Sequence, residues 1–296
     1  MHYTSEDDEP GLNSDVMLLN KDPDTGPGEV SPVHPLASRH RIIRLLVIPV
    51  LVSAIWVLEI YLFGGAVHLF TAPAGPALAL YTIVACILIG LVIPVFLIRR
   101  AFISGAVNMF QFGFRSLRRT ISMAAITCLL LYGSFILFSP PGLGRVAFTQ
   151  SFLLLLPTGI AAAMICWVIA GTHVQALVRY GGPVISIPAG IVVTGILFGL
   201  AMLMLVPAPR SPDLLSLYIG AGILMALFFF AVRDIYATSI AATGCMVFLF
   251  SGSITPAGIS PVLPWVYAAA IVTSGVLVGI HWYLSLHFVT LQIPRV

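Results

Sequence analysis

Apolar residues form eight long, nearly uninterrupted runs between residue 42 and the C-terminal region. A transmembrane helix needs roughly 20 consecutive apolar residues to cross a hydrocarbon core about 30 Å thick. The runs lack the polar–apolar alternation of barrel strands, and in lipid only helices or closed barrels satisfy the backbone. The pattern therefore predicts an all-α, polytopic membrane protein with about eight transmembrane helices. The expected spans are Ile42–Phe63, Ala77–Ile98, Ile121–Phe138, Val146–Ala170, Val184–Val206, Leu214–Val232, Ile235–Phe250 and Trp265–Phe288.

The seventh run, Ile235–Phe250, is the shortest. A short span of this kind is either partly re-entrant or sheltered by neighbouring helices. Composition excludes the main alternative class, because 59% of the 296 residues are hydrophobic and only 8% are charged. A soluble globular domain does not have these proportions.

Acidic residues are concentrated at the N-terminus. Eight of the eleven Asp and Glu residues precede position 39, where Lys21 is the single basic residue. The same stretch is rich in Pro, Gly and Ser and has too few apolar residues to bury, which predicts disorder. We therefore expect a disordered acidic tail over residues 1–40, followed by a helical transmembrane domain over residues 41–296.

Basic residues are distributed unevenly around the spans. Twelve of the fourteen Lys and Arg residues fall on one predicted side, and only Arg145 and Arg210 fall on the other. The positive-inside rule assigns the side rich in Lys and Arg to the cytoplasm. This assignment predicts a multi-pass protein of the cell membrane with both termini in the cytoplasm.

The segment Ala101–Thr120 differs from the spans around it. Its apolar residues recur at spacings of three and four, opposite a polar face that includes Arg115, Arg118 and Arg119. This periodicity predicts an amphipathic helix at the cytoplasmic headgroup boundary, with the three arginines binding lipid. The alternative is a cytoplasmic extension of the third span.

Signatures of common catalytic and cofactor sites are missing. There is no HExxH, GxSxG, P-loop or dinucleotide-binding motif, and the four cysteines are isolated within apolar segments. We expect no metal, no cofactor and no nucleic-acid partner. Glu59 is the one carboxylate inside a span, so it is either a functional group or a structural residue near the outer membrane surface.

Spans four to seven carry a set of short motifs in a recognisable order. Val174-Gln-Ala-Leu-Val-Arg179 is followed by a helix that contains Phe198 and Met202, and later by Arg233-Asp234 and Ala242. This layout, over about residues 146–250, resembles the CPBP family of intramembrane proteases, which includes the CAAX prenyl endopeptidases. The family has the motifs Glu-Glu-x-x-x-Arg, Phe-x-x-x-His and His-x-x-x-Asn/Asp.

The resemblance preserves the scaffold of these motifs and lacks their catalytic groups. Arg179 and Phe198 match the family arginine and phenylalanine. The remaining motif positions correspond to residues without acid–base chemistry. They are Val174 and Gln175 for the two glutamates, Met202 for the first histidine, and Ala242 and Met246 for the second histidine and its partner.

In the family the glutamates activate water and the histidines orient it, whereas Val, Met and Ala cannot ionise and Gln is no general base. The resemblance therefore implies a pseudoenzyme that binds or shields a membrane partner, either a prenylated peptide or another membrane protein. Two alternatives stay open. One is an active CAAX-type endopeptidase that uses diverged residues. The other is a small-molecule transporter or channel, although the spans hold few polar residues and show no internal repeat.

The orientation is testable by cysteine labelling. Cysteines placed at Ser31 and Ser116 should be protected from a membrane-impermeant maleimide in intact cells and should react after the cells are opened. The unmodified protein gives the background from its native cysteines. Labelling of either position from outside would reverse the predicted orientation.

Overall fold

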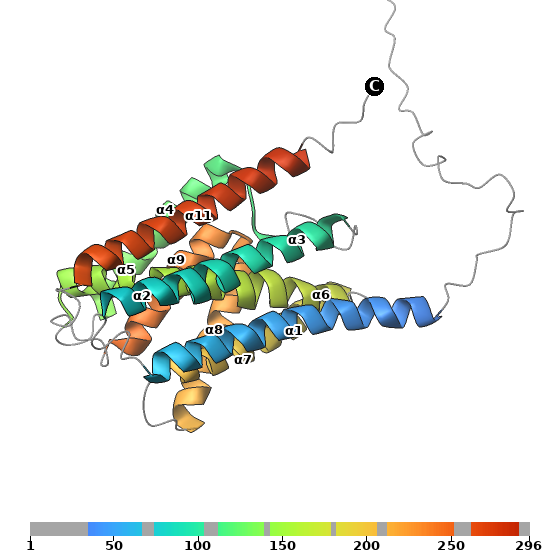
Figure 1. The fold of residues 1–296 in the computed structure, drawn as a ribbon, viewed down its shortest axis with the longest axis horizontal. Helices are drawn as coiled ribbons and strands as arrows, with labels where there is room; N and C mark the ends of the chain where they lie inside the picture. Colours follow the sequence, from blue (N-terminus) through green and yellow to red (C-terminus); the bar gives the residue numbers. More distant parts are fainter. Residues whose placement is uncertain are drawn as a thin grey trace, which may run out of the picture. The chain divides into compact units, whose positions relative to one another are not determined.

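The computed structural model describes residues 35–66, 74–103, 112–138, 143–178, 182–205, 212–251 and 262–289. These residues are predominantly helical, and no strand occurs among them (Figure 1). The chain divides into two units, Met1–Arg41 and Ile42–Val296, and the arrangement described below is that of the second unit.

Helical segments coincide with all eight predicted spans. The elements are α1 (Pro35–Ala66), α2 (Gly75–Tyr81), η2 (Thr82–Val92), α3 (Ile93–Ile103), α4 (Leu117–Phe138), α5 (Arg145–Ala162), η4 (Ala163–Gly171), α6 (Thr172–Leu177), α7 (Gly182–Leu205), α8 (Pro212–Val232), α9 (Ile235–Phe250) and α11 (Leu263–Val289). Within the described residues, six helical stretches are long and apolar enough to cross a membrane. The apolar helices Val47–Phe63 and Ile235–Phe250 are shorter, so the total of eight crossings stays a prediction.

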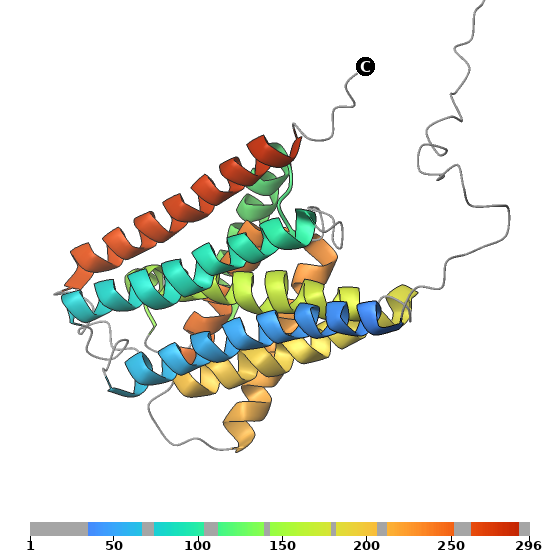
Figure 2. The same ribbon diagram turned by 45° about the vertical axis from the view of Figure 1, so that its right-hand side comes forward.

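The stretch Arg145–Leu177, formed by α5, η4 and α6, is the central helix of the second unit. In its most apolar window 83% of the residues are buried, compared with 11% in α4. A helix that is hydrophobic on all sides is expected to be enclosed by other helices. Here the central helix contacts α7, α9, α11 and η2, which lie around it in both ribbon views (Figures 1 and 2).

Two stretches, η2 and η4, have π-helical hydrogen bonding. The stretch η4 belongs to the central helix, and η2 packs against that helix. The helices that contain them cross where small residues meet. A Cβ atom added to Gly90 would lie 2.5 Å from the Cβ of Ala161. Such close approach at small residues is typical of helix pairs in membranes, where dispersion contacts replace the hydrophobic effect.

Helices α7 and α8 form the most extensive pair in the fold. Glycines on α7 make the close approach possible. A Cβ on Gly199 would lie 2.8 Å from the backbone nitrogen of Ile219, and one on Gly195 would lie 3.0 Å from that of Ile223. The sequence motif Gly195-x-x-x-Gly199 is therefore a packing surface for α8.

The short helix α9 packs against α4, α5 and α8. Most residues of α9 are buried. Its contact with α5 is close, because a Cβ atom added to Gly159 of α5 would collide with Thr243 of α9. This packing agrees with the prediction that neighbouring helices shelter the short seventh span.

The predicted interfacial helix Ala101–Thr120 is wrong over residues 112–116, whereas residues 117–120 extend the third predicted span, as the alternative stated. Residues 112–116 are not α-helical, and α4 begins at Leu117. Phe112 and Phe114 are buried in the protein because the chain turns inward at Gly113, whose φ is +84°. Residues 104–111 lie outside the described part of the chain.

The boundary of the predicted tail also differs from the observed helix. Helix α1 begins at Pro35, inside the segment expected to be disordered. Residues 1–34 lie outside the described residues, so the acidic tail stays a prediction.

The glycine contacts can be tested with a matched pair of substitutions. Gly199→Ala should destabilise the protein by about 1–3 kcal/mol, because the new methyl group would meet the backbone of α8. Gly279→Ala on α11 has no described atom within 4 Å of the new Cβ. It should be neutral or stabilising by about 0.5–1 kcal/mol through helix propensity. Thermal unfolding in detergent compares the two, and equal stabilities would contradict the packing.

Candidate functional site

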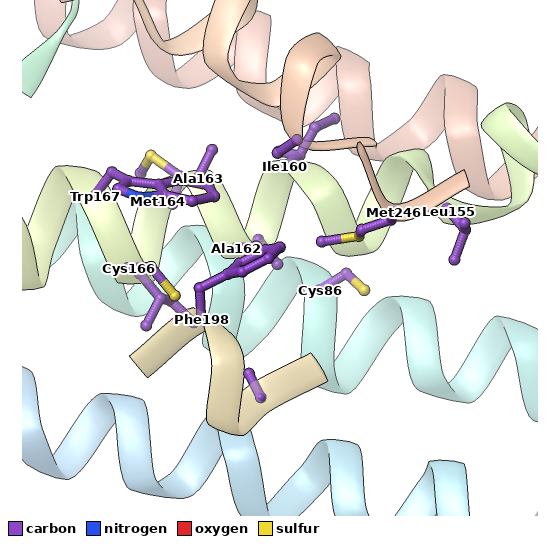
Figure 3. Close-up of a cluster of buried hydrophobic side chains, with 14 of the residues drawn as sticks. Cys86, Leu155, Ile160, Ala162, Ala163, Met164, Cys166, Trp167, Phe198 and Met246 are labelled. Carbon is purple, nitrogen blue, oxygen red and sulfur yellow. The ribbon is translucent and has the colours of Figure 1, made fainter. Parts of the chain in front are cut away.

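Most positions identified by the resemblance lie in the packed core. Phe198, Met202, Ala242 and Met246 are fully buried members of one hydrophobic cluster. Figure 3 shows Phe198 of α7 and Met246 of α9 pointing toward the central helix, and the Phe198 ring lies 5.2 Å from the Trp167 ring. These four side chains fill space between helices.

The remaining positions lie at the end of the central helix. Val174 and Gln175 are half-buried on α6, whereas Arg179 lies outside the described residues. Gln175 Oε1 accepts a hydrogen bond of 2.7 Å from Arg233 Nη2. Val174 faces a different environment, because it lines an apolar groove. No other described residue among the identified positions does so.

This groove lies between α1, α6 and α7 and has a volume of about 380 Å³. Its lining by described residues contains no Asp, Glu, Lys or Arg, and Ser53 and His173 are the only polar side chains among those residues. The full lining is Pro49, Val50, Ser53, Ala54, Val57, Ala170, His173, Val174, Leu177, Val193, Ile196, Leu197 and Leu200. The volume lies within the range typical of small-molecule sites.

His173 is 5% exposed and has a defined tautomer. Its Nδ1 lies 2.7 Å from the carbonyl oxygen of Ile169, and a carbonyl only accepts, so Nδ1 carries the proton. In the neutral ring Nε2 is then an acceptor, and it forms no hydrogen bond with a described residue. The Ser53 hydroxyl is also buried without a partner among the described residues.

A separate polar cluster lies where the segment before α4 meets the link between α8 and α9. Its centre is the fully buried Asp234. Asp234 Oδ1 accepts hydrogen bonds of 3.0 Å from the amides of Tyr236 and Ala237, and so caps the N-terminus of α9. Asp234 Oδ2 accepts one of 2.8 Å from the Thr120 hydroxyl of α4. One carboxylate therefore joins two helices that are far apart in sequence.

Arginines cover the other end of this link, the C-terminus of α8. Arg115 Nε donates to the carbonyl of Arg233 at 3.2 Å, and Arg119 Nη2 lies 3.4 Å from the carbonyl of Val232. The guanidinium of Arg233 lies 4.6 Å from the centre of the Phe230 ring. Cations placed here satisfy terminal carbonyls and oppose the negative end of the helix dipole.

The electrostatics of the cluster follow from this crowding. Partial burial, and then repulsion by Arg115, lower the pKa of Arg233 to about 10. The pKa of Arg115 is also lowered, by partial burial and by Arg119, while attraction to Asp234 acts in the opposite direction. Arg233 therefore stays protonated at neutral pH, although its environment disfavours the charge.

His281 connects this cluster to α11. Its Nε2 donates to the carbonyl of Arg115 at 3.0 Å, and its Nδ1 lies 3.1 Å from the Tyr236 hydroxyl. The ring also packs edge-on against Phe114, with 5.6 Å between ring centres. Both nitrogens are therefore used in holding α9, α11 and the segment before α4 together.

Of the other sequence-predicted groups, Arg115 and Arg119 belong to the polar cluster, whereas Glu59 lies apart from both sites. Glu59 is half-buried on α1 and forms no hydrogen bond with a described residue. Arg118 and Arg119 are exposed in the first turn of α4, and Arg115 is half-buried before it. Among the described residues, no three His, Cys, Asp or Glu side chains come close enough together to hold a metal ion.

The chain matches no known family, no curated protein and no solved structure in the comparisons made. The groove and the polar cluster are therefore interpreted from their own chemistry. Sequence reasoning did not identify His173 and His281 as candidate residues. The rule that marked Glu59 as a candidate applies equally to these two histidines. Ionisable side chains within membrane segments are functional or paired by default, whatever their type.

The role of Asp234 can be tested against the second acidic residue among helices α8 and α9. Asp234→Ala should lower stability by about 2–4 kcal/mol, because α9 loses its cap and the buried Thr120 hydroxyl loses its acceptor. Asp213→Ala, at an exposed position in the first turn of α8, should cost less than about 1 kcal/mol. Thermal unfolding of the two variants measures the difference, and a similar loss in both would exclude the capping role.

Proposed function

We propose that this protein is a non-catalytic integral membrane protein that binds the apolar part of a membrane partner in the groove between α1, α6 and α7. The observation that carries the proposal is the lining of the groove, which among the described residues is almost entirely hydrocarbon and includes no carboxylate. Such a site can hold an apolar chain, but offers no Asp or Glu to activate water.

Size favours one kind of partner over another. A volume of about 380 Å³ suits a single hydrocarbon chain and is small for a transmembrane helix, whose diameter with side chains is about 10–12 Å. Of the two partners implied by the resemblance, the prenylated peptide is therefore preferred over a second membrane protein. Its prenyl chain would lie in the groove.

The resemblance to the CPBP family supports the same proposal. Val174 takes the place of a catalytic glutamate and lines the groove, while Phe198, Met202, Ala242 and Met246 contribute to the core. The protein would then keep a position of the family site and use it for binding. An active protease is the alternative that the mass spectrometry below tests.

The proposal includes a membrane setting. We expect both termini in the cytoplasm, because the positive-inside rule assigns the side rich in Lys and Arg to the cytoplasm. Arg118 and Arg119, exposed at the start of α4, and the half-buried Arg115 are positioned to attract anionic headgroups, with about 1 kcal/mol for each residue near the surface.

A photo-crosslinking experiment tests the groove. The protein in phosphatidylcholine vesicles is exposed to a farnesylated peptide with a diazirine on its prenyl chain. Saturable crosslinks should map to α1, α6 and α7. Ala54→Trp, which fills the groove, should weaken labelling on the order of tenfold, equivalent to about 1.4 kcal/mol. Ala125→Trp on the exposed face of α4 is the matched control and should label normally.

Mass spectrometry of the same peptide tests the absence of catalysis. The peptide should be recovered intact, with or without added divalent metal. Cleavage by the unmodified protein that a change at Gln175 or Met202 abolishes would instead identify an active protease. Absence of any saturable labelling of the groove would refute the binding function.

A further inference from the structure

The groove contains a hydrogen-bond acceptor that no described residue uses. We infer that the groove also takes a neutral lipid alcohol, whose hydroxyl donates to Nε2 of His173 while its hydrocarbon chain lies between α1 and α7. The inference rests on the proposed function in treating the groove as a binding site, and it adds a second class of ligand.

The tautomer of His173 determines that the ligand must carry a hydrogen-bond donor. Because Nδ1 donates to the Ile169 carbonyl, Nε2 of the neutral ring requires a donor. The His173 side chain is 5% exposed and lines an apolar groove, where a polar atom without a hydrogen-bond partner costs free energy. Ser53 also lines the groove, and its hydroxyl is buried without a partner among the described residues. An alcohol supplies the donor that Nε2 of His173 requires.

The charge of the lining sets a second condition. None of the described residues that line the groove is acidic or is a lysine or arginine. An ionised ligand group would be desolvated there without a partner of opposite charge, which is strongly unfavourable. This condition disfavours fatty-acid carboxylates and phosphate headgroups within the groove, and it leaves neutral hydroxyl compounds.

The depth of His173 agrees with an amphiphile. His173 precedes Gln175 by two residues, about 3 Å along the helix axis, and Gln175 contacts Arg233 of the polar cluster. The acceptor therefore lies just inside the polar boundary. Along α7 the lining continues from Val193 to Leu200, about 10 Å of apolar surface that can contact a chain.

A matched pair of ligands tests the inference. Hexadecanol with a diazirine on its chain and the methyl ether of the same compound differ only in the hydrogen-bond donor. In phosphatidylcholine vesicles, the alcohol should label α1, α6 and α7 of the unmodified protein about threefold to tenfold better than the ether, as expected for one buried hydrogen bond.

Substitutions at His173 identify the acceptor. His173→Phe should abolish the preference for the alcohol, whereas His173→Gln, whose side-chain oxygen accepts a hydrogen bond, should restore part of it. Because the ligand comparison is made on the unmodified protein, it decides the question even if a variant folds poorly. Ala54→Trp should block both compounds.

Each outcome has a distinct meaning. Equal labelling by alcohol and ether in the unmodified protein would show filling by any hydrocarbon chain and would overturn the inference. If the farnesylated peptide still labels the groove in that case, the proposed function stands. If neither the peptide nor either compound labels the groove saturably, the proposed function fails as well.

Discussion

In a hydrocarbon environment every backbone and side-chain polar group must find its partner within the protein. The threonines of this fold follow the constraint. Most threonine hydroxyls inside the described helices donate to the carbonyl four residues earlier, so these are satisfied within their own helix. Examples are Thr82 with Leu78, Thr127 with Met123, Thr194 with Gly190, Thr243 with Ser239 and Thr273 with Ala269. Such hydroxyls add little polarity to the surface that neighbouring helices contact.

The link between α8 and α9 is where helical hydrogen bonding stops, and the same constraint explains the polar cluster there. Arg233 adopts a φ of +52°, and the two residues between the helices leave terminal amides and carbonyls exposed. The Asp234 carboxylate accepts hydrogen bonds from the amides at the start of α9. Arg115 and Arg119 donate hydrogen bonds to the carbonyls at the end of α8. The cluster is therefore explained by the needs of the backbone, and the groove, which has unused polar atoms, is the better candidate for ligand binding.

Sequence reasoning succeeded where one physical signal dominated. Long apolar runs predicted the helical segments, including the short Ile235–Phe250, whose bounds agree with α9. It failed over Ala101–Thr120, because periodicity does not reveal that Phe112 and Phe114 turn inward at Gly113. The groove could not be predicted either, because its walls come from three helices whose spacing depends on packing. Val174 was identified from the resemblance, whereas His173 beside it was not.

Helix α1 differs from the rest of the second unit in how it is attached. Among the described residues its backbone approaches other helices far less closely than α7 approaches α8, and Trp56 and Ile60 provide its fully buried contacts. Segments with few buried contacts are the ones that open at the lowest free energy. Helix α7, which forms one wall of the groove, packs tightly against α8. Helix α1, which forms the opposite wall, is therefore the helix more easily displaced. We therefore expect exchange of a bound chain with the bilayer to proceed by lateral displacement of α1.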